Sequence, residues 1–368
     1  MIDPEELGAW LRLLETPGVG RESVRRLLAA FGSPQAVIAA DAGARREVVG
    51  AAQANALVDE PEGLAALHAA TLAWLQQVDA AAPRSVIPLG DARYPAALLN
   101  SPDPPLMLYA QGRVELLQSD SIAIVGSRHP TAQGAANAGA FARELSRAGL
   151  TIVSGMALGV DAAAHAGALD GAASTIAVVG TGLDRVYPRR HLALAHRIAQ
   201  HGLIVSEYAL GTPPLATHFP QRNRIIAGLS RGTLVVEAAV QSGSLITARL
   251  ANEAGREVFA IPGSIHSPQA RGCHVLLRQG AKLVETAQDV LEELRPTVAR
   301  DTPAAAVGPP SDTDPLLDAL GFDPVTLDAL AARTGLGAAA LSARLLGLEL
   351  DGLVARLPGQ LFQRVAGR

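Results

Sequence analysis

Cysteine and long apolar runs are almost absent from this chain of 368 residues. Its single cysteine, Cys273, excludes an intrachain disulfide and a zinc site built on cysteine thiolates. No apolar run reaches the roughly 18 residues that a membrane-spanning helix needs. The first residues, MIDPEELGAWLRLL, carry acids where a signal peptide would carry a basic region. We therefore expect a folded, cytoplasmic protein without a membrane partner.

Lysine is also scarce, and the chain has no excess of positive charge. Lys282 is the only lysine, so nearly all the positive charge is arginine, which we attribute first to codon bias. The 31 Lys and Arg residues are outnumbered by 35 Asp and Glu residues, which gives a net charge of -4. No global basic field attracts nucleic acid, so any anion site must be local.

Apolar periodicity divides the chain into four parts. Residues 1–80 carry helical patterns such as SVRRLLAAFG and predict a small all-helical domain. Residues 84–296 alternate apolar strands (SIAIVGS, LTIVSGM, STIAVVGTG) with Ala-rich helices, which indicates a doubly wound parallel sheet with helices on both faces. Residues 297–313 are rich in Pro and Ala and predict a linker. Residues 314–368 predict three helices and a two-stranded hairpin, the winged-helix pattern.

Four loops that follow predicted strands share glycines and hydroxyls. Ligands of doubly wound sheets bind beyond the carboxyl ends of the strands. Glycine lets a ligand approach the backbone, and hydroxyls add donors. A tight turn explains any one loop equally well, but together they predict an anion cradle, helped by free N–H groups of the helix that begins near Pro130. The loop residues are Gly126, Ser127, Arg128, Ser154, Gly155, Gly180, Gly182, Ser242, Gly243 and Ser244.

The segment FPQRNRIIAGLS, residues 219–230, adds Arg222 and Arg224 directly before an apolar helix. No Asp or Glu occurs from Tyr208 to Val236. We therefore expect these arginines to lack acidic partners and to await a phosphate-bearing ligand.

Dinucleotide binding and catalysis find less support. GTGLDR has an arginine where the dinucleotide fingerprint needs its third glycine, and no Walker A lysine is present. Asp161 and His165 share a helix face and could orient a base or bind a metal, but bracing of the helix by Asp161, with His165 as its partner, is the simpler interpretation. Glu207 and Glu237 could be catalytic acids, although carboxylates that hold loops through backbone N–H groups explain them as well.

Several of these motifs together resemble one family. VGSRHPTAQG, SGMALGVDAAAH, VVGTGLDRVYPRRH and FPQRNRIIAGLSRGTLVVEAAVQSGSL are similar in order and spacing to the bacterial DNA-processing protein A (DprA/Smf) family, over residues 91–294. The resemblance implies an extended Rossmann-like domain that binds single-stranded DNA without sequence preference and forms a homodimer. It also implies RecA recombinase as a partner, which such proteins help to load on incoming strands during natural transformation. By the same resemblance we expect neither enzymatic activity nor a cofactor.

The resemblance also implies site residues and shows two departures. It places Arg128, Arg222 and Arg224 on backbone phosphates, with Arg189 as a further basic residue and Phe219 as a platform for a base. The family commonly has a basic residue where this chain has Gln241, and an asparagine where it has His191. The resemblance also implies that the phosphate cradle is completed by Asn223, Ser242, Gly243, Ser244 and Thr247.

Composition suggests how such a site would bind. Aromatic residues make up only 3% of the chain, so we expect phosphate contacts to dominate and binding to be steep in salt. The segment TPGVGRESVRRLL resembles a helix-hairpin-helix, which either contacts DNA or only packs against a neighbour. In the winged helix, the expected recognition segment GAAALSARLLGLELD has one basic residue, Arg344, and two acidic ones, Glu349 and Asp351, which favours protein or regulatory contacts over groove reading.

Two alternatives stay open. Phosphoribohydrolases of related fold carry P-G-G-x-G-T-x-x-E, of which this chain keeps Gly232, Thr233 and a displaced acid, Glu237. The second alternative is an adaptor that has no nucleic-acid role, against which the unpaired arginines argue.

Overall fold

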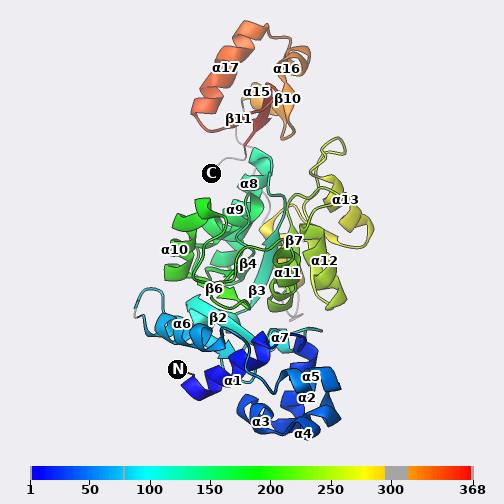
Figure 1. Ribbon diagram of the computed structural model, residues 1–368. Helices are drawn as coiled ribbons and strands as arrows, with labels where there is room; N and C mark the ends of the chain where they lie inside the picture. Colours follow the sequence, from blue (N-terminus) through cyan, green and yellow to red (C-terminus); the bar gives the residue numbers. More distant parts are fainter. Residues whose placement is uncertain (1, 78, 295–313, 366–368) are drawn as a thin grey trace.

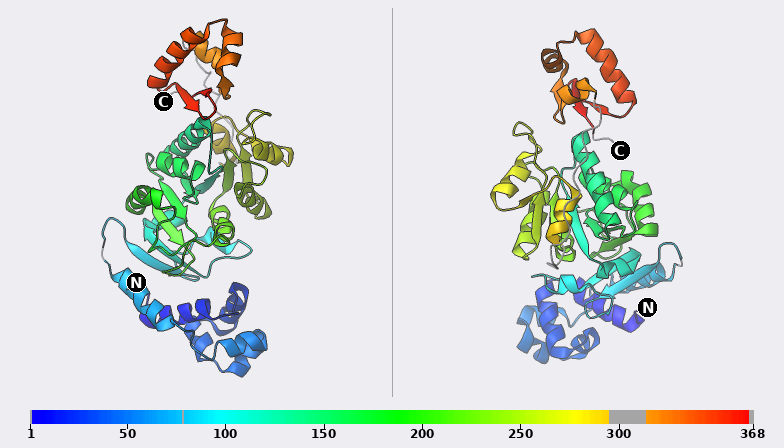
Figure 2. Two further views of the ribbon diagram at one scale, coloured as in Figure 1. Left: turned by 45° about the horizontal axis from the view of Figure 1, so that its top comes forward. Right: turned by 180° about the vertical axis from the view of Figure 1, so that it is seen from behind.

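The computed structural model describes residues 2–77, 79–294 and 314–365. The expected linker, residues 297–313, lies outside these ranges. Within them, no helix is both long enough and apolar enough to cross a membrane. An N-terminal group of helices, a central sheet flanked by helices and a small C-terminal domain follow one another along the molecule (Figures 1 and 2).

Six helices form the N-terminal part. The first begins because Asp3 accepts hydrogen bonds from the N–H groups of Glu5 and Glu6, with Pro4 at the first helical position. The core of these helices includes Leu7 and Leu11 and continues into Met107 and Tyr109 of a central strand. The helical part is therefore packed on the edge of the sheet. Its helices are α1 (Pro4–Glu15), α2 (Arg21–Phe31), α3 (Pro34–Ala39), α4 (Ala42–Val48), α5 (Ala51–Ala56) and α6 (Leu64–Gln76).

The central sheet has nine strands in the order β1-β2-β6-β5-β4-β3-β7-β8-β9. Strands β3 to β9 pair in parallel through continuous apolar runs such as SIAIV, as the sequence predicts. At one edge two further strands extend the parallel sheet: β2 pairs antiparallel with β6, and β1 pairs antiparallel with β2. The strands are β1 (Arg84–Pro88), β2 (Met107–Gly112), β3 (Ser121–Val125), β4 (Thr151–Ser154), β5 (Thr175–Val178), β6 (Leu203–Ser206), β7 (Gly232–Val235), β8 (Glu257–Ala260) and β9 (Lys282–Leu283).

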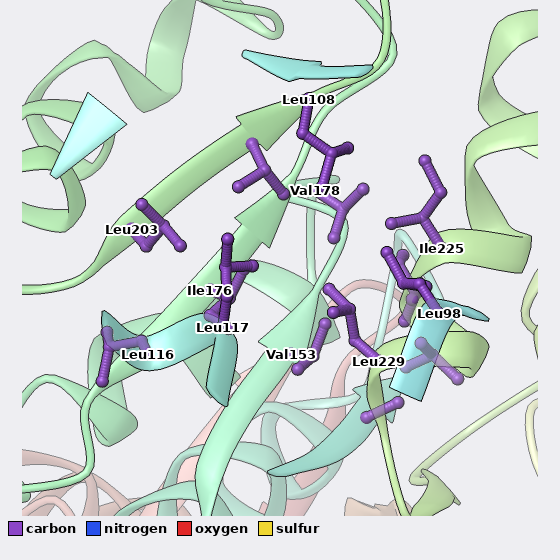
Figure 3. Packing of buried hydrophobic residues seen from close by; sticks show 14 of the residues in the cluster. Leu98, Leu108, Leu116, Leu117, Val153, Ile176, Val178, Leu203, Ile225 and Leu229 are labelled. Carbon is purple, nitrogen blue, oxygen red and sulfur yellow. The ribbon is translucent and has the colours of Figure 1, made fainter. Parts of the chain in front are cut away.

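Helices cover both faces of this sheet, which confirms the doubly wound, Rossmann-like α/β architecture (Figure 1). One core lies under α7, α11, α12 and α13, and Figure 3 shows Leu98, Ile225 and Leu229 packing there against strand residues such as Val178. The other face lies under α8, α9, α10 and α14. The bounds are α7 (Ala96–Leu99), η1 (Val114–Gln118), α8 (Ala132–Arg147), α9 (Val160–Ala168), η2 (Arg189–His191), α10 (Leu192–His201), α11 (His218–Leu229), α12 (Ser244–Glu253), α13 (Arg271–Arg278) and α14 (Ala287–Leu294).

The strand order reverses between β3 and β7. From β3 the chain builds outward through β4, β5 and β6, and then returns to β3 and continues on the other side with β7, β8 and β9. The loops after β3 and β7 therefore leave the sheet in opposite directions and open a crevice at its carboxyl edge. The sequence places Gly126 to Arg128 and Ser242 to Ser244 there.

The C-terminal domain is a winged helix, as expected. The hairpin of β11 and β12 is joined by a short third strand, β10, which pairs with β12. Leu330, Leu341 and Leu345 fill the core between the helices. The elements are α15 (Pro315–Leu320), β10 (Val325–Thr326), α16 (Leu327–Thr334), α17 (Ala338–Leu350), β11 (Val354–Leu357) and β12 (Leu361–Arg364).

Candidate nucleic-acid interface

A cavity of about 620 Å³ opens at the carboxyl edge of the sheet, in the crevice between β3 and β7. Segments that follow β3, β4, β5, β6 and β7, together with one face of α11, form its walls. Nine of the residues expected from the sequence line it: Gly126, Arg128, Phe219, Arg222, Asn223, Ser242, Gly243, Ser244 and Thr247. Segments that are up to about 120 residues apart in sequence thus converge as the cradle hypothesis requires.

The loop after β3 is fixed by backbone contacts. A side chain at Gly126 would come within 2.9 Å of the Glu237 carbonyl oxygen, so only glycine fits there. The Ser127 N–H donates to that same carbonyl oxygen at 2.7 Å. Arg128 is exposed, and its guanidinium carbon lies 6.0 Å from the centre of the Phe219 ring. The loop therefore holds one exposed cation beside an aromatic side chain of the cavity wall.

Arg222 supplies a second cation from inside the protein. Its residue surface is only 4% exposed, one guanidinium N–H group donates to the Val178 carbonyl oxygen, and its Nε atom has no hydrogen-bond partner. Gly155 makes room for it, because a Cβ there would overlap the guanidinium. Burial lowers the pKa of Arg222 to about 10, although the nearby Asp161 carboxylate acts in the opposite direction. The group stays charged at neutral pH and faces the cavity with unused donors.

Asp161 braces the turn behind this arginine. Its carboxylate accepts N–H groups of Gly155 at 3.1 Å and Ala157 at 3.2 Å, across a turn in which Met156 has a φ of +56°. Burial raises the pKa of Asp161, while the charge of Arg222 opposes the rise. Asp161 is thus a bracing residue, but it holds the turn before α9 and not the helix itself, and it also lines the cavity.

His165 does not bond to Asp161, so the expected pairing of the two is wrong. The His165 Nδ1 atom lies 2.7 Å from the Thr175 hydroxyl, which itself donates to a carbonyl oxygen, and Nε2 accepts the Met156 N–H at 3.3 Å. The ring is therefore neutral with its proton on Nδ1. Burial lowers its pKa to about 3, and the charges of Arg222 and His191 add to this effect.

The loop before α12 forms the opposite wall. The Ser242 and Ser244 hydroxyls lie 2.5 Å apart, and the Asn223 amide donates to the Gly243 carbonyl oxygen at 3.4 Å. Gly243 is the N-cap residue of α12, and the Ser242 hydroxyl accepts the N–H of Ser244, the first helical residue, at 3.3 Å. The start of this helix therefore contributes the positive end of its dipole to the cavity wall.

Aromatic side chains line one end of the cavity. The Phe219 and Tyr187 rings lie 5.5 Å apart at 34°, and Tyr187 is 48% exposed. Tyr208 does not line this cavity and stacks on His218, with ring centres 4.0 Å apart and an angle of 12° between the ring planes. The geometry offers one apolar surface to a planar ring.

The expectation that the arginines of this segment lack acidic partners is wrong for Arg224. It donates to both carboxylate oxygens of Glu207, at 2.8 and 2.5 Å, and to Asp103 at 3.2 Å. Arg231 pairs with Asp120 at 3.2 Å. Asp103 and Asp120 come from distant segments, and Glu207 lies directly before the window from Tyr208 to Val236, so the window contains none of the three acids.

The N-terminus of α8 is also satisfied from within, contrary to the expectation of free N–H groups there. The Glu237 carboxylate accepts hydrogen bonds from the Thr131 N–H at 2.9 Å and from the Thr131 hydroxyl at 2.6 Å. The Thr131 hydroxyl oxygen in turn accepts the Gly134 N–H and so caps the first turn of α8. This confirms Glu237 as a loop-holding carboxylate. Glu207 holds arginines, with no backbone N–H group bonded to it in the described part of the chain, so the same expectation is wrong for Glu207.

The other expected residues surround the cavity without lining it. Arg189 lines a separate cavity of about 540 Å³ beside α10. Gly180 lies behind the Phe219 ring, and the Ser154 hydroxyl donates to the Ile124 carbonyl oxygen at 2.7 Å. The residues outside the wall are Ser127, Ser154, Gly155, Gly180, Gly182, Arg189 and Arg224.

Both departures from the family pattern have local consequences. His191 donates from Nδ1 to the Met156 carbonyl oxygen at 3.0 Å and so helps to hold the turn behind Arg222. Gln241 is exposed beside the loop before α12 and adds no charge there. Sequence reasoning missed the Asp103 and Glu207 cluster altogether, because no local signal connects these acids to Arg224.

The fold and the cavity define a class of protein, a doubly wound domain with an arginine-lined cavity at its topological switch point. The family model for DNA recombination-mediator protein A matches residues 85–295. The models for a DprA-like N-terminal HHH domain and for a DprA winged-helix domain match residues 4–56 and 300–360.

Relatives and solved structures agree with these matches. Protein Smf of Escherichia coli is 42% identical over 298 residues, which cover 78% of this chain and 79% of that protein. The X-ray structure of DNA processing protein A from Streptococcus pneumoniae superposes with a TM-score of 0.68 at 38% identity, covering 79% of this chain and 98% of that one. A structure of DNA processing protein A from Helicobacter pylori, which concerns its single-stranded DNA binding mode, has a TM-score of 0.52 at 34% identity and covers 57% and 95%. The chain belongs to the DNA recombination-mediator protein A (DprA/Smf) family.

Proposed function

We propose that this protein binds single-stranded DNA in the 620 Å³ cavity without sequence preference. The carrying observation is the Arg222 guanidinium, which is buried, charged and oriented toward the cavity with an unpartnered Nε atom. Arg128 supplies further phosphate donors, the positive dipole end of α12 lies at the same cavity, and Phe219 with Tyr187 offers a surface for one base. Backbone phosphates and a ring face occur at every nucleotide, so these contacts do not read sequence.

The family suggests the wider role. We infer that the protein is a cytoplasmic recombination mediator, acting as a homodimer, that loads RecA on incoming strands during natural transformation. The family's description as a recombination mediator and the DNA-binding mode studied for the Helicobacter pylori relative support this proposal. RecA filament formation on single strands, measured with and without this protein, tests it. Faster nucleation supports the role, and no change contradicts it.

A binding role is favoured over the phosphoribohydrolase alternative. The acid nearest to that enzyme motif, Glu237, is engaged in holding Thr131, and the carboxylate on the cavity floor, Asp161, is engaged by backbone N–H groups. Neither is placed as a free acid. Incubation with nucleoside monophosphates should therefore release no base, and detectable release would restore the enzymatic hypothesis.

Fluorescence anisotropy of a labelled oligo-dT tests the DNA site. We expect Arg128→Ala/Arg222→Ala to weaken binding and to reduce the slope of log affinity against log salt by about 1.4, since each lost phosphate contact on a single strand removes about 0.7. The matched control is Arg143→Ala/Arg231→Ala, which also removes two arginines, both paired with acids at the opposite edge of the sheet. Absence of wild-type binding at low salt, or equal slopes in both double variants, would contradict the proposal.

A further inference from the structure

Two cavities meet at the start of α11. The first is the proposed DNA site, lined by Phe219. The second, about 780 Å³, lies between the N-terminal helices and the central domain and is lined by the preceding residue, His218. The stacked rings of His218 and Tyr208 stand on this second side. His218 and Phe219 are consecutive, so a DNA strand that leaves the first cavity and passes around the start of α11 reaches the second cavity.

The turn between α1 and α2 presents open backbone to the second cavity. Gly20 lines it and is the N-cap of α2, with no side-chain hydrogen bond to the first helical N–H groups. A Cβ at Gly18 or Gly20 would meet no atom within 4 Å, so nothing in the described chain covers the turn. Arg21 and Arg25, one helical turn apart, point into the same space.

A carboxylate of the chain itself sits on these two arginines. Asp103, in the loop between α7 and β2, has one oxygen 2.6 Å from Arg21 Nη2 and the other 2.9 Å from Arg25 Nη1. Partial burial opposes its ionisation, but the hydrogen bonds from both arginines hold the pKa of Asp103 well below its usual range. Two guanidinium groups that share the two oxygens of one anion form the arrangement that also binds a phosphate.

We propose that Arg21, Arg25 and the start of α2 form a second phosphate subsite for the same DNA strand, and that Asp103 occupies this subsite until a phosphate displaces it. The inference rests on the proposed function. It assigns the hairpin of the N-terminal domain to DNA and explains why a carboxylate, and not a neutral side chain, stands on the arginine pair. Glu15, Glu22 and Glu207 also line this cavity, so a phosphate enters only in exchange for Asp103. Glu207 also lies 3.3 Å from Arg21, and Arg224 lies 3.2 Å from Asp103, so the arginine pair is part of a larger ion cluster.

The test removes the competing carboxylate. In oligo-dT titrations at several salt concentrations, Asp103→Asn is expected to bind more tightly than the wild type at low salt. Its salt slope should be steeper by about 0.7 to 1.4, for one or two added phosphate contacts. Adding Arg21→Gln and Arg25→Gln to this variant should return the slope to the wild-type value. The matched control is Asp170→Asn, which removes one exposed, arginine-paired acid at the far end of α9.

An Asp103→Asn slope no steeper than that of Asp170→Asn, or a steep slope that survives loss of both arginines, would overturn the proposal. A second probe separates this result from failure of the proposed function. Inorganic pyrophosphate, titrated into full-length Asp103→Asn, should shift the amide resonances of Gly20 and Arg21, and this shift should be absent from the variant that also lacks Arg21 and Arg25. No shift in Asp103→Asn would refute the subsite, even if the protein binds no oligo-dT at all.

Discussion

Replacing Arg222 with lysine should make DNA binding depend on pH. Burial lowers the pKa of the arginine to about 10, roughly 2.5 below its ordinary value, and the wild-type site therefore stays charged up to about pH 9. The same environment should bring a lysine at this position from about 10.4 to about 8. If only the charged form binds phosphate, Arg222→Lys loses about tenfold in affinity between pH 7 and pH 9, which corresponds to about 1.4 kcal/mol.

Anisotropy titrations of oligo-dT at pH 7, 8 and 9 measure this effect. The wild type should be nearly flat across the range. Arg128→Lys, at an exposed position, should be flat as well, because an exposed lysine keeps its charge. Circular dichroism at each pH checks that the Arg222→Lys variant is folded. Equal affinity of this variant at pH 7 and pH 9 would refute the reasoning, since it would mean that residue 222 is either hydrated or not in contact with the strand.

Three further outcomes follow from the structure. Phe219→Ala should weaken oligo-dT binding by about 1–3 kcal/mol without changing the salt slope, because a stacked base carries no counterions; a changed slope would argue against stacking. Burial lowers the pKa of His165 to about 3, so below about pH 6.5 this histidine takes up a proton in the unfolded chain and not in the folded one. Lowering the pH from 7.5 to 5.5 should therefore reduce the free energy of unfolding, measured by urea titration, by about 1.4 kcal/mol. The His165→Gln variant should lack this loss. Truncation after Leu294 should leave oligo-dT affinity within a few-fold of the full chain, because Arg344 on α17 is paired with Asp314; a loss of most affinity would assign DNA contacts to the winged helix.

The parallel part of the sheet could be predicted because its signal is local. Each strand is a continuous apolar run followed by a helix pattern, and SIAIV is buried at every position of β3. The antiparallel edge could not be predicted in this way. β2, Met107–Gly112, follows a proline-rich loop and pairs with β6 almost a hundred residues later. The residue pattern of β2 does not indicate whether it pairs parallel or antiparallel with that strand.

The loop residues that line the candidate site could be predicted from the sequence, whereas the ion pairs beside it could not. Gly126, Arg128 and Ser242 to Ser244 meet in one cavity because strand ends in a doubly wound sheet share an edge. Ion pairs follow no such rule. The partner of Arg224 is 17 residues away in one case and 121 in the other, so the absence of acids from a local window says nothing about the space around an arginine.

The two arginines of the RNR motif do different things, and helix geometry requires it. Residues two apart on an α-helix project about 200° from each other, so Arg222 and Arg224 cannot reach the same phosphate. Arg222 and its neighbour Asn223 face the cavity, whereas Arg224 turns to Glu207 and Asp103 on the side of the N-terminal domain. The helix thus joins the proposed DNA site to the ion cluster that holds Arg21. A variant that loses Arg224 should consequently disturb the docking of the N-terminal helices while leaving the number of phosphate contacts in the first cavity unchanged.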